Sequence, residues 1–123
     1  MLRPSKVHGI GLFAAEHIKR GVPVWQFNPA LDVRLDESDL RQLAPPARAQ
    51  VDSYAYLDNR TGELILCGDD ARFFNHSATP NVIDSATDPY LCIAARDIAA
   101  GEELTQDYFS FDARADKKLS KAA

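Results

Sequence analysis

The chain has 123 residues, of which 46% are hydrophobic and 26% charged, and its formal charge is −4. A chain of this length and composition is expected to form one globular domain spanning residues 1–123. Its apolar stretches are too short to cross a membrane, and its first residues lack the apolar segment of a secretory signal, so we expect a cytoplasmic protein. It has no basic stripe and is not expected to bind nucleic acid directly.

The first half of the chain predicts two strands and then two helices. A short apolar run covers residues 11–14, and residues 22–27 alternate between polar and apolar after a turn. Farther along, Ser38 is expected to cap a short helix over residues 39–43. A second helix is expected over residues 46–54, with a proline in its first turn.

The second half predicts mainly strands. Residues 58–62 form a turn signal before an apolar run at 63–67, which indicates a hairpin. Residues 68–74 predict a single helical turn, and strands are expected at 90–95 and 103–108. The basic residues near the C-terminus predict a frayed end or a short helix.

One segment has an unusual composition for either a turn or a core strand. Residues 72–77 read Arg-Phe-Phe-Asn-His-Ser, and Pro80-Asn81 follows at short range. Amide, imidazole and hydroxyl groups need many hydrogen-bond partners, and an unpaired one in apolar surroundings costs about 1–3 kcal/mol. The mixture of two large aromatic residues with three polar ones therefore indicates a binding site.

Two further motifs complete a pattern. Residues 6–14 read Lys-Val-His-Gly-Ile-Gly-Leu-Phe-Ala, and residues 101–108 read Gly-Glu-Glu-Leu-Thr-Gln-Asp-Tyr. Each motif alone is weak, but the three in this order resemble the SET domain of protein-lysine methyltransferases from about residue 6 to residue 112. Residues 113–123 would be a flexible or helical tail.

The resemblance implies a mostly β, β-clip-like fold of several small antiparallel sheets with one or two short helices. It also implies a knot-like C-terminal segment that brings residues 75–77 beside residues 103–108. Threaded topologies are rare, so composition alone would not have predicted this arrangement.

The implied activity is transfer of a methyl group from S-adenosylmethionine to the ε-amine of a protein lysine, in a histone-like or another basic substrate. The reaction requires collinear reactants, and positioning can contribute on the order of 7–11 kcal/mol. It also requires a neutral amine, although a free lysine has a pKa of about 10.4. An apolar channel and a nearby sulfonium disfavour the ammonium form.

The resemblance assigns the cofactor site to three parts of the chain. Gly9, Ile10 and Gly11 would bind the methionine end of S-adenosylmethionine, because glycines let backbone N–H groups approach a carboxylate. Asn75 and His76 would hold the amino-acid and adenine ends. The alternative for the glycines alone is a plain hairpin turn.

A further cofactor contact is predicted for Arg72, which would pair with the cofactor carboxylate or, equally well, form a surface ion pair with Asp69 or Asp70.

Tyr108 matches the active-site tyrosine of the family, and its alternative role is core packing. Tyr54 is the candidate for the second catalytic tyrosine. Tyr56 is its alternate and is otherwise assigned to the substrate channel. Phe109 and Phe111 would close the channel. The number of methyl groups transferred is not predicted.

The two cysteines, Cys67 and Cys92, are expected to be buried small residues, because neither has the close cysteine or histidine neighbours of a zinc site. Many SET enzymes carry a zinc-binding cysteine cluster after the tyrosine, and this chain has none there. It therefore resembles a minimal type that binds no metal. Its cofactor pocket would be covered by residues 109–119, by a second subunit in a homodimer, or by the substrate.

Two other functions remain open from the sequence. One is a non-catalytic SET-like binding module, favoured by the missing C-terminal closure. The other is a methyltransferase with a non-lysine acceptor, which would keep the same pocket. A nuclear location is an alternative to the cytoplasm if the source is eukaryotic.

Overall fold

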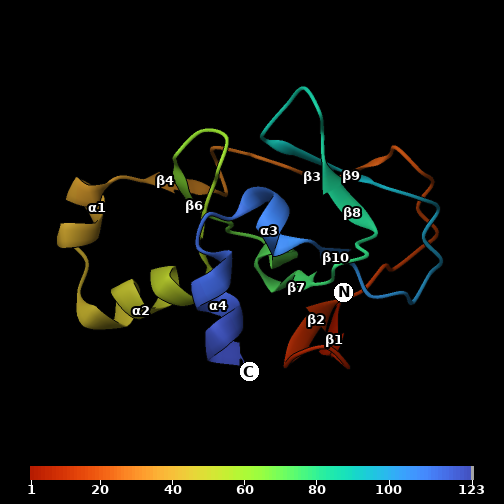
Figure 1. The fold of residues 1–123 in the computed structure, drawn as a ribbon, viewed down its shortest axis with the longest axis horizontal. Coiled ribbons are helices and arrows are strands. Elements are labelled where there is room, and N and C mark those ends of the chain that lie inside the picture. Colours follow the sequence, from red (N-terminus) through yellow and green to blue (C-terminus); the bar gives the residue numbers. More distant parts are fainter. Residues whose placement is uncertain (123) are drawn as a thin grey trace.

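The computed structural model describes residues 1–122, and Figure 1 shows short strands and helices joined by long loops. The described strands are β1 (Leu2–Pro4), β2 (Ile10–Leu12), β3 (Pro23–Gln26), β4 (Val33–Leu35), β5 (Tyr56–Leu57), β6 (Leu64–Leu66), β7 (Asn75–His76), β8 (Val82–Asp84), β9 (Leu91–Ala94) and β10 (Thr105–Gln106). The described helices are α1 (Glu37–Arg41), α2 (Pro45–Tyr54), the 3-10 helix η1 (Asp70–Phe73), α3 (Tyr108–Phe111) and α4 (Ala115–Ala122).

The strands form four small sheets within this part of the chain. Three of them are antiparallel: the pair β1–β2, the sheet β3–β9–β8, and the sheet β4–β6–β5. The fourth is the parallel pair β7–β10. The prediction of several small antiparallel sheets is confirmed, with two differences: one pair is parallel, and the short helices are more numerous than the one or two expected.

The helices before the hairpin begin slightly earlier than predicted. Helix α1 is capped by Asp36, whose side chain accepts a hydrogen bond from the backbone of Asp39, while the Asp39 side chain accepts one from the backbone of Asp36. This reciprocal capping box satisfies two free N–H groups, so the prediction that Ser38 is the cap was wrong. Helix α2 begins at Pro45, one residue before the expected start.

The parallel pair β7–β10 joins two segments that are far apart in the sequence. Asn75 pairs with Thr105, and His76 pairs with Gln106. The next residue, Ser77, donates its N–H to the Gln106 carbonyl over 3.0 Å. The expected proximity of residues 75–77 and 103–108 is confirmed.

The strand predicted over residues 103–108 is shorter than expected. It is reduced to β10 and a single bridge between Phe13 and Glu103. Asp107 leaves the strand and caps helix α3 by accepting a hydrogen bond from the Phe109 N–H over 3.0 Å. Tyr108 is therefore the first residue of a helix and not the last of a strand.

The buried side chains form two clusters. The larger one lies around Trp25, Phe74 and Val82 and includes both cysteines, which are free and buried as predicted. The smaller one packs helix α2 on the β4–β6–β5 sheet through Val51 and Leu64. None of the described helices is long and apolar enough to span a membrane.

Candidate functional site

The glycine loop comprises residues 9–11. It ends the turn that joins β1 to β2 and includes the first two residues of β2 (Figure 1). Gly9 has a φ of +47°, a backbone conformation that residues other than glycine rarely adopt. Its carbonyl accepts a hydrogen bond from the Ser5 N–H over 2.8 Å. A Cβ added at Gly9 would meet no atom within 4 Å. The backbone here is therefore open to close approach by a ligand.

Asn75 fixes this loop from the other side. Its side-chain N–H₂ lies 3.0 Å from the His8 carbonyl, 3.4 Å from the Ile10 carbonyl and 2.8 Å from Glu103 Oε2. Asn75 is buried, so each of these groups replaces a lost water contact. The structure thus brings together the glycine loop and the Asn-His pair, as predicted, and adds Glu103 between them.

Glu103 is the centre of this cluster. The Ser5 hydroxyl donates to its two carboxylate oxygens over 2.7 and 2.9 Å. A Cβ added at Gly11 would lie only 2.4 Å from Glu103 Oε2. A side chain at position 11 would therefore displace this carboxylate from its hydrogen bonds, a reason for the second glycine that the sequence did not reveal.

His76 holds the start of helix α3. Its Nδ1 accepts a hydrogen bond from the Tyr108 backbone N–H over 3.1 Å, so in the neutral ring the proton is on Nε2. The ring also packs at 5.4 Å from the Tyr108 ring and 5.5 Å from the Phe109 ring. These contacts position the tyrosine, and the predicted contact of His76 with the cofactor stays a prediction.

A cavity lies between β3, β9, α3 and the end of helix α2, with about 600 Å³ of empty space that includes open solvent. Four of the aromatic residues predicted for catalysis or the substrate channel line it: Tyr54, Tyr56, Tyr108 and Phe111. Phe109 does not, and its side chain is exposed.

The Tyr108 hydroxyl donates to the Phe74 carbonyl, and its oxygen keeps lone pairs that can accept a hydrogen bond. Burial, and then the nearby carboxylates Asp112 and Glu103, raise the pKa of Tyr108 to about 12. The phenol is therefore neutral at physiological pH and can serve as a dipole but not as a base.

The other aromatic rings support each other edge to face. Tyr56 lies 5.2 Å from Phe111, which in turn lies 6.0 Å from Tyr108. Tyr54 packs 5.6 Å from Phe73. Burial also raises the pKa of Tyr56, so its hydroxyl is neutral as well.

Arg72 lies at the rim of this aromatic group. Its guanidinium donates two hydrogen bonds to the Cys67 carbonyl, over 3.1 and 2.9 Å, and lies 5.3 Å from the centre of the Tyr54 ring. This arrangement differs from the surface ion pair with Asp69 or Asp70. Its pairing with a cofactor carboxylate stays a prediction.

Three buried polar atoms of residues that line the cavity have no hydrogen bond among the described residues; one, Asp112 Oδ2, forms an ion pair with Lys118, and the other two have no partner of either kind. These two are the donor Trp25 Nε1 and the acceptor Asp58 Oδ2. Buried polar groups in folded proteins are nearly always paired, and an unpaired one is costly. A donor and an acceptor on one wall are consistent with a cavity that takes a polar ligand.

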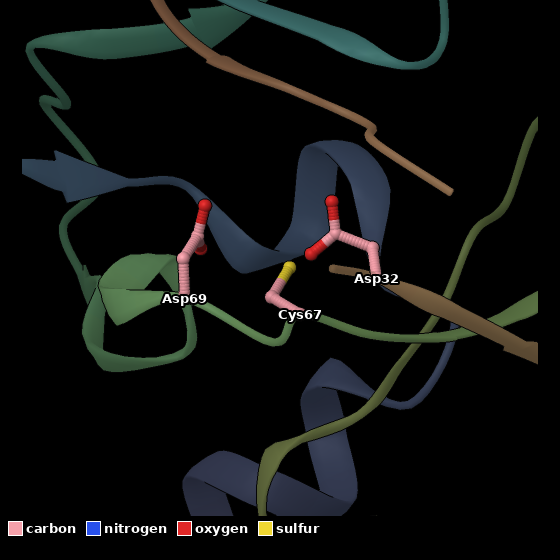
Figure 2. Close-up of side chains that lie close together, drawn as sticks. All are labelled: Asp32, Cys67 and Asp69. Carbon is pink, nitrogen blue, oxygen red and sulfur yellow. The ribbon is translucent and has the colours of Figure 1, made fainter. Parts of the chain in front are cut away.

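One group of possible metal ligands consists of two aspartates and Cys67, which also lines the cavity. Figure 2 shows Asp32, Cys67 and Asp69 with their side chains converging. The Asp32 oxygens accept hydrogen bonds from the N–H groups of Gly68 and Asn28, and Asp69 caps η1. Burial, and then the two aspartates, raise the pKa of the Cys67 thiol to about 12, which disfavours the thiolate that binds metals. The hydrogen bonds accepted by the two aspartates tie the segments around residues 28 and 68 and the start of η1 together.

Sequence reasoning missed several residues of this region. Glu103 stood in the Gly-Glu-Glu motif but was not predicted as a site residue. The signal that could have identified it is its position two residues after the turn at Gly101. Asp58, Asp112 and Lys118 line the cavity but carry no local signal, because their neighbours lie elsewhere in the chain.

Comparison with known proteins gives one consistent result. The model of the SET domain family matches residues 9–109. The "Histone-lysine N-methyltransferase, H3 lysine-4 specific" of Schizosaccharomyces pombe is 35% identical over an alignment of 124 positions, which covers 93% of this chain and 13% of the relative. The chain thus spans a small part of that relative's length.

Two solved structures share the fold. A Plasmodium falciparum protein superposes with a TM-score of 0.56 at 20% identity, covering 88% of this chain and 94% of that one. A humanized mutant of the Chaetomium thermophilum Polycomb Repressive Complex 2, bound to the inhibitor GSK126, gives a TM-score of 0.62 at 24% identity, with 89% and 15% covered. The small sheets and short helices are those of this group of structures.

Proposed function

The chain belongs to the SET-domain family, and we propose that it is an S-adenosylmethionine-dependent protein-lysine N-methyltransferase. The observation that carries the proposal is the cavity lined by Tyr54, Tyr56, Tyr108 and Phe111. An aromatic cavity suits the stem of a lysine side chain, and burial favours the neutral amine that the reaction needs.

The proposed cofactor site is the glycine loop together with Asn75 and His76. The open space around Gly9 and the loop's anchoring by Asn75 fit a ligand that approaches the backbone closely. S-adenosylmethionine, when bound there, supplies an electrophilic methyl group. No metal is proposed.

The proposed role of the chain in the reaction is to position the amine and keep it neutral. The neutral phenol of Tyr108 lines the cavity, and its oxygen can accept a hydrogen bond from the incoming amine while its O–H donates to the Phe74 carbonyl. His76 fixes the backbone of Tyr108. In the proposed transfer, the nitrogen lone pair would form the bond to the methyl carbon as the carbon–sulfur bond breaks with its electrons going to sulfur. The methylated ammonium would then lose one proton to solvent.

The proposed substrate is a lysine in another protein. The name of the Schizosaccharomyces pombe relative specifies lysine 4 of histone H3 as the substrate of that relative. We also propose a homodimer, because Phe109 and other apolar side chains are exposed. The proposed location is the cytoplasm. Sedimentation that shows only monomer at high concentration would contradict the dimer.

The test of the proposed function is methyl transfer from labelled S-adenosylmethionine to proteins of a cell lysate. Tyr108→Phe is expected to keep cofactor affinity and to lower turnover by roughly 10²–10³, the usual effect of losing one hydrogen-bonding group at a reacting centre. Tyr90→Phe is the matched control, because it removes a hydroxyl that bonds Glu63 outside the cavity.

Three outcomes distinguish the alternatives. Loss of transfer in Tyr108→Phe alone supports the proposal. Cofactor binding without transfer by the wild type would identify a non-catalytic module. Transfer at full speed by Tyr108→Phe would make Tyr108 a packing residue and would remove the centre of the proposal.

A further inference from the structure

Lys118 occupies an unusual position for a lysine. It lies on helix α4, next to α2 and α3 in Figure 1, and its side chain is 19% exposed. It lines the same cavity as the aromatic residues, with its Nζ 5.9 Å from the centre of the Tyr108 ring. Its neighbour Lys117 on the same helix is exposed.

A buried carboxylate holds this amine in place. Lys118 Nζ lies 2.6 Å from Asp112 Oδ2, and the Asp112 side chain is 1% exposed. The other Asp112 oxygen accepts hydrogen bonds from the N–H groups of Leu57 and Arg114, over 3.1 and 2.9 Å. Asp112 thereby ties the start of α4 to the hairpin and directs the lysine at the cavity.

The segment around Asp112 is fixed on several sides. The Asn59 N–H donates to the Phe111 carbonyl over 2.9 Å, and the Ala113 N–H donates to the Leu57 carbonyl over 2.8 Å. Arg114 lies 3.8 Å from Asp52 of helix α2. The position of Lys118 is therefore set by the fold and does not depend on a loose tail.

We propose that Lys118 is methylated by the active site of its own chain. The inference rests on the proposed function, since it needs the same cavity and the same methyl donor. It adds a modification site, because Lys118 lines the cavity that the proposed mechanism assigns to the acceptor amine, close to the Tyr108 ring.

The state of the amine agrees with this role. Burial lowers the pKa of Lys118, although Asp112 acts in the opposite direction. In the balanced step, Lys118 loses a proton to Asp112 Oδ2 and then to solvent. The Nζ lone pair forms the bond to the methyl carbon, the carbon–sulfur bond of S-adenosylmethionine breaks with its electrons going to sulfur, and S-adenosylhomocysteine is released.

Incubation of the purified full chain with labelled S-adenosylmethionine tests the proposal, followed by intact mass and peptide mapping. The expected product is one methylated lysine, at position 118, formed by the wild type and by the matched control Lys117→Arg. Lys118→Arg is expected to lose the label while its unfolding midpoint in urea stays close to that of the wild type. The labelled fraction per chain should not depend on protein concentration, because the transfer is intramolecular.

The outcomes separate this inference from the proposed function. If the wild type methylates lysate proteins but Lys118 stays unmodified, the inference is overturned and the function stands. If label appears on Lys118→Arg as fast as on the wild type, the acceptor is another residue, and the inference is also overturned. If Lys118 is labelled only in concentrated samples, the transfer is between chains and the intramolecular step is wrong.

Discussion

At the scale of single residues, one carboxylate connects three segments of the proposed cofactor site. Glu103 accepts hydrogen bonds from Ser5 and Asn75 and lies against the bare Cα of Gly11. Hydrogen bonds to a charged group contribute about 1.5–3 kcal/mol each. The glycine loop therefore depends on Glu103 for its position even if the ligand touches only the backbone.

Gly11→Ala should therefore weaken the proposed site. The added methyl group would lie 2.4 Å from Glu103 Oε2, so the carboxylate has to move away from Ser5 and Asn75. We expect lower affinity for S-adenosylhomocysteine in calorimetry and a loss of stability of about 1–3 kcal/mol, as for overpacking in general.

A double variant tests the cause. Glu103→Asp shortens the side chain, so Gly11→Ala combined with Glu103→Asp should be less destabilised than the sum of the two single changes. Strict additivity in urea unfolding would mean that the methyl group clashes with something else.

The sequence identified some of these residues but not their reasons. Tyr108, Asn75 and Gly11 stand in motifs that predict a site. The pairing of Glu103 with Ser5 joins residues 98 apart, and no local pattern reports it. Lys118 was assigned only to a basic tail, since the carboxylate that holds it becomes a neighbour only in the folded chain.

At the scale of elements, helix α3 decides where Tyr108 points. The chain leaves β10 at Asp107, whose side chain caps the helix and lies 3.7 Å from His76 Nδ1. The sequence predicted a longer strand because residues 103–108 alternate in polarity. The competing signal was an aspartate at the N-cap position, directly before the four residues of α3, and capping prevailed.

Asp107→Ala is expected to destabilise the chain by about 0.5–2 kcal/mol, the usual cost of a lost cap, and to reduce turnover in the transfer assay. Turnover should fall because the Tyr108 backbone is no longer fixed at the start of the helix. Asp36→Ala is the control: it removes the cap of α1, far from the cavity, and should cost stability in urea unfolding without changing turnover. Equal turnover for both variants would separate the cap from the chemistry.

The short strands β4 and β8 mark the limit of prediction at this scale. Each has three residues, too few for an alternating pattern to stand out. Both are held by neighbouring strands, β6 and β9, that the sequence did predict in part. Local propensity cannot report such pairing, because the stabilising partner lies elsewhere in the chain.

At the scale of the whole molecule, two cysteine thiols and two tyrosine hydroxyls, which ionise only at alkaline pH, line one cavity. Burial is the first cause of a raised pKa for all of them: Cys67, Cys92, Tyr56 and Tyr108. Their neutral forms add no charge of their own to the cavity wall at physiological pH, so the charges on it come from other lining residues such as Asp112 and Lys118. The fold therefore depends on these groups staying protonated, which makes it sensitive to alkali.

The free energy of unfolding should therefore fall as the pH rises above about 9. In the unfolded chain, a thiol ionises near its usual pKa of 9.0, whereas the folded Cys67 keeps its proton until about 12. Between these values the folded state binds more protons than the unfolded state, so stability decreases by roughly 1.4 kcal/mol per pH unit for each such thiol. Urea unfolding at pH 7, 9 and 10 measures this, with Cys67→Ala expected to show a shallower decline. A stability that stays constant from pH 8 to 10 would show that the thiols ionise equally in both states.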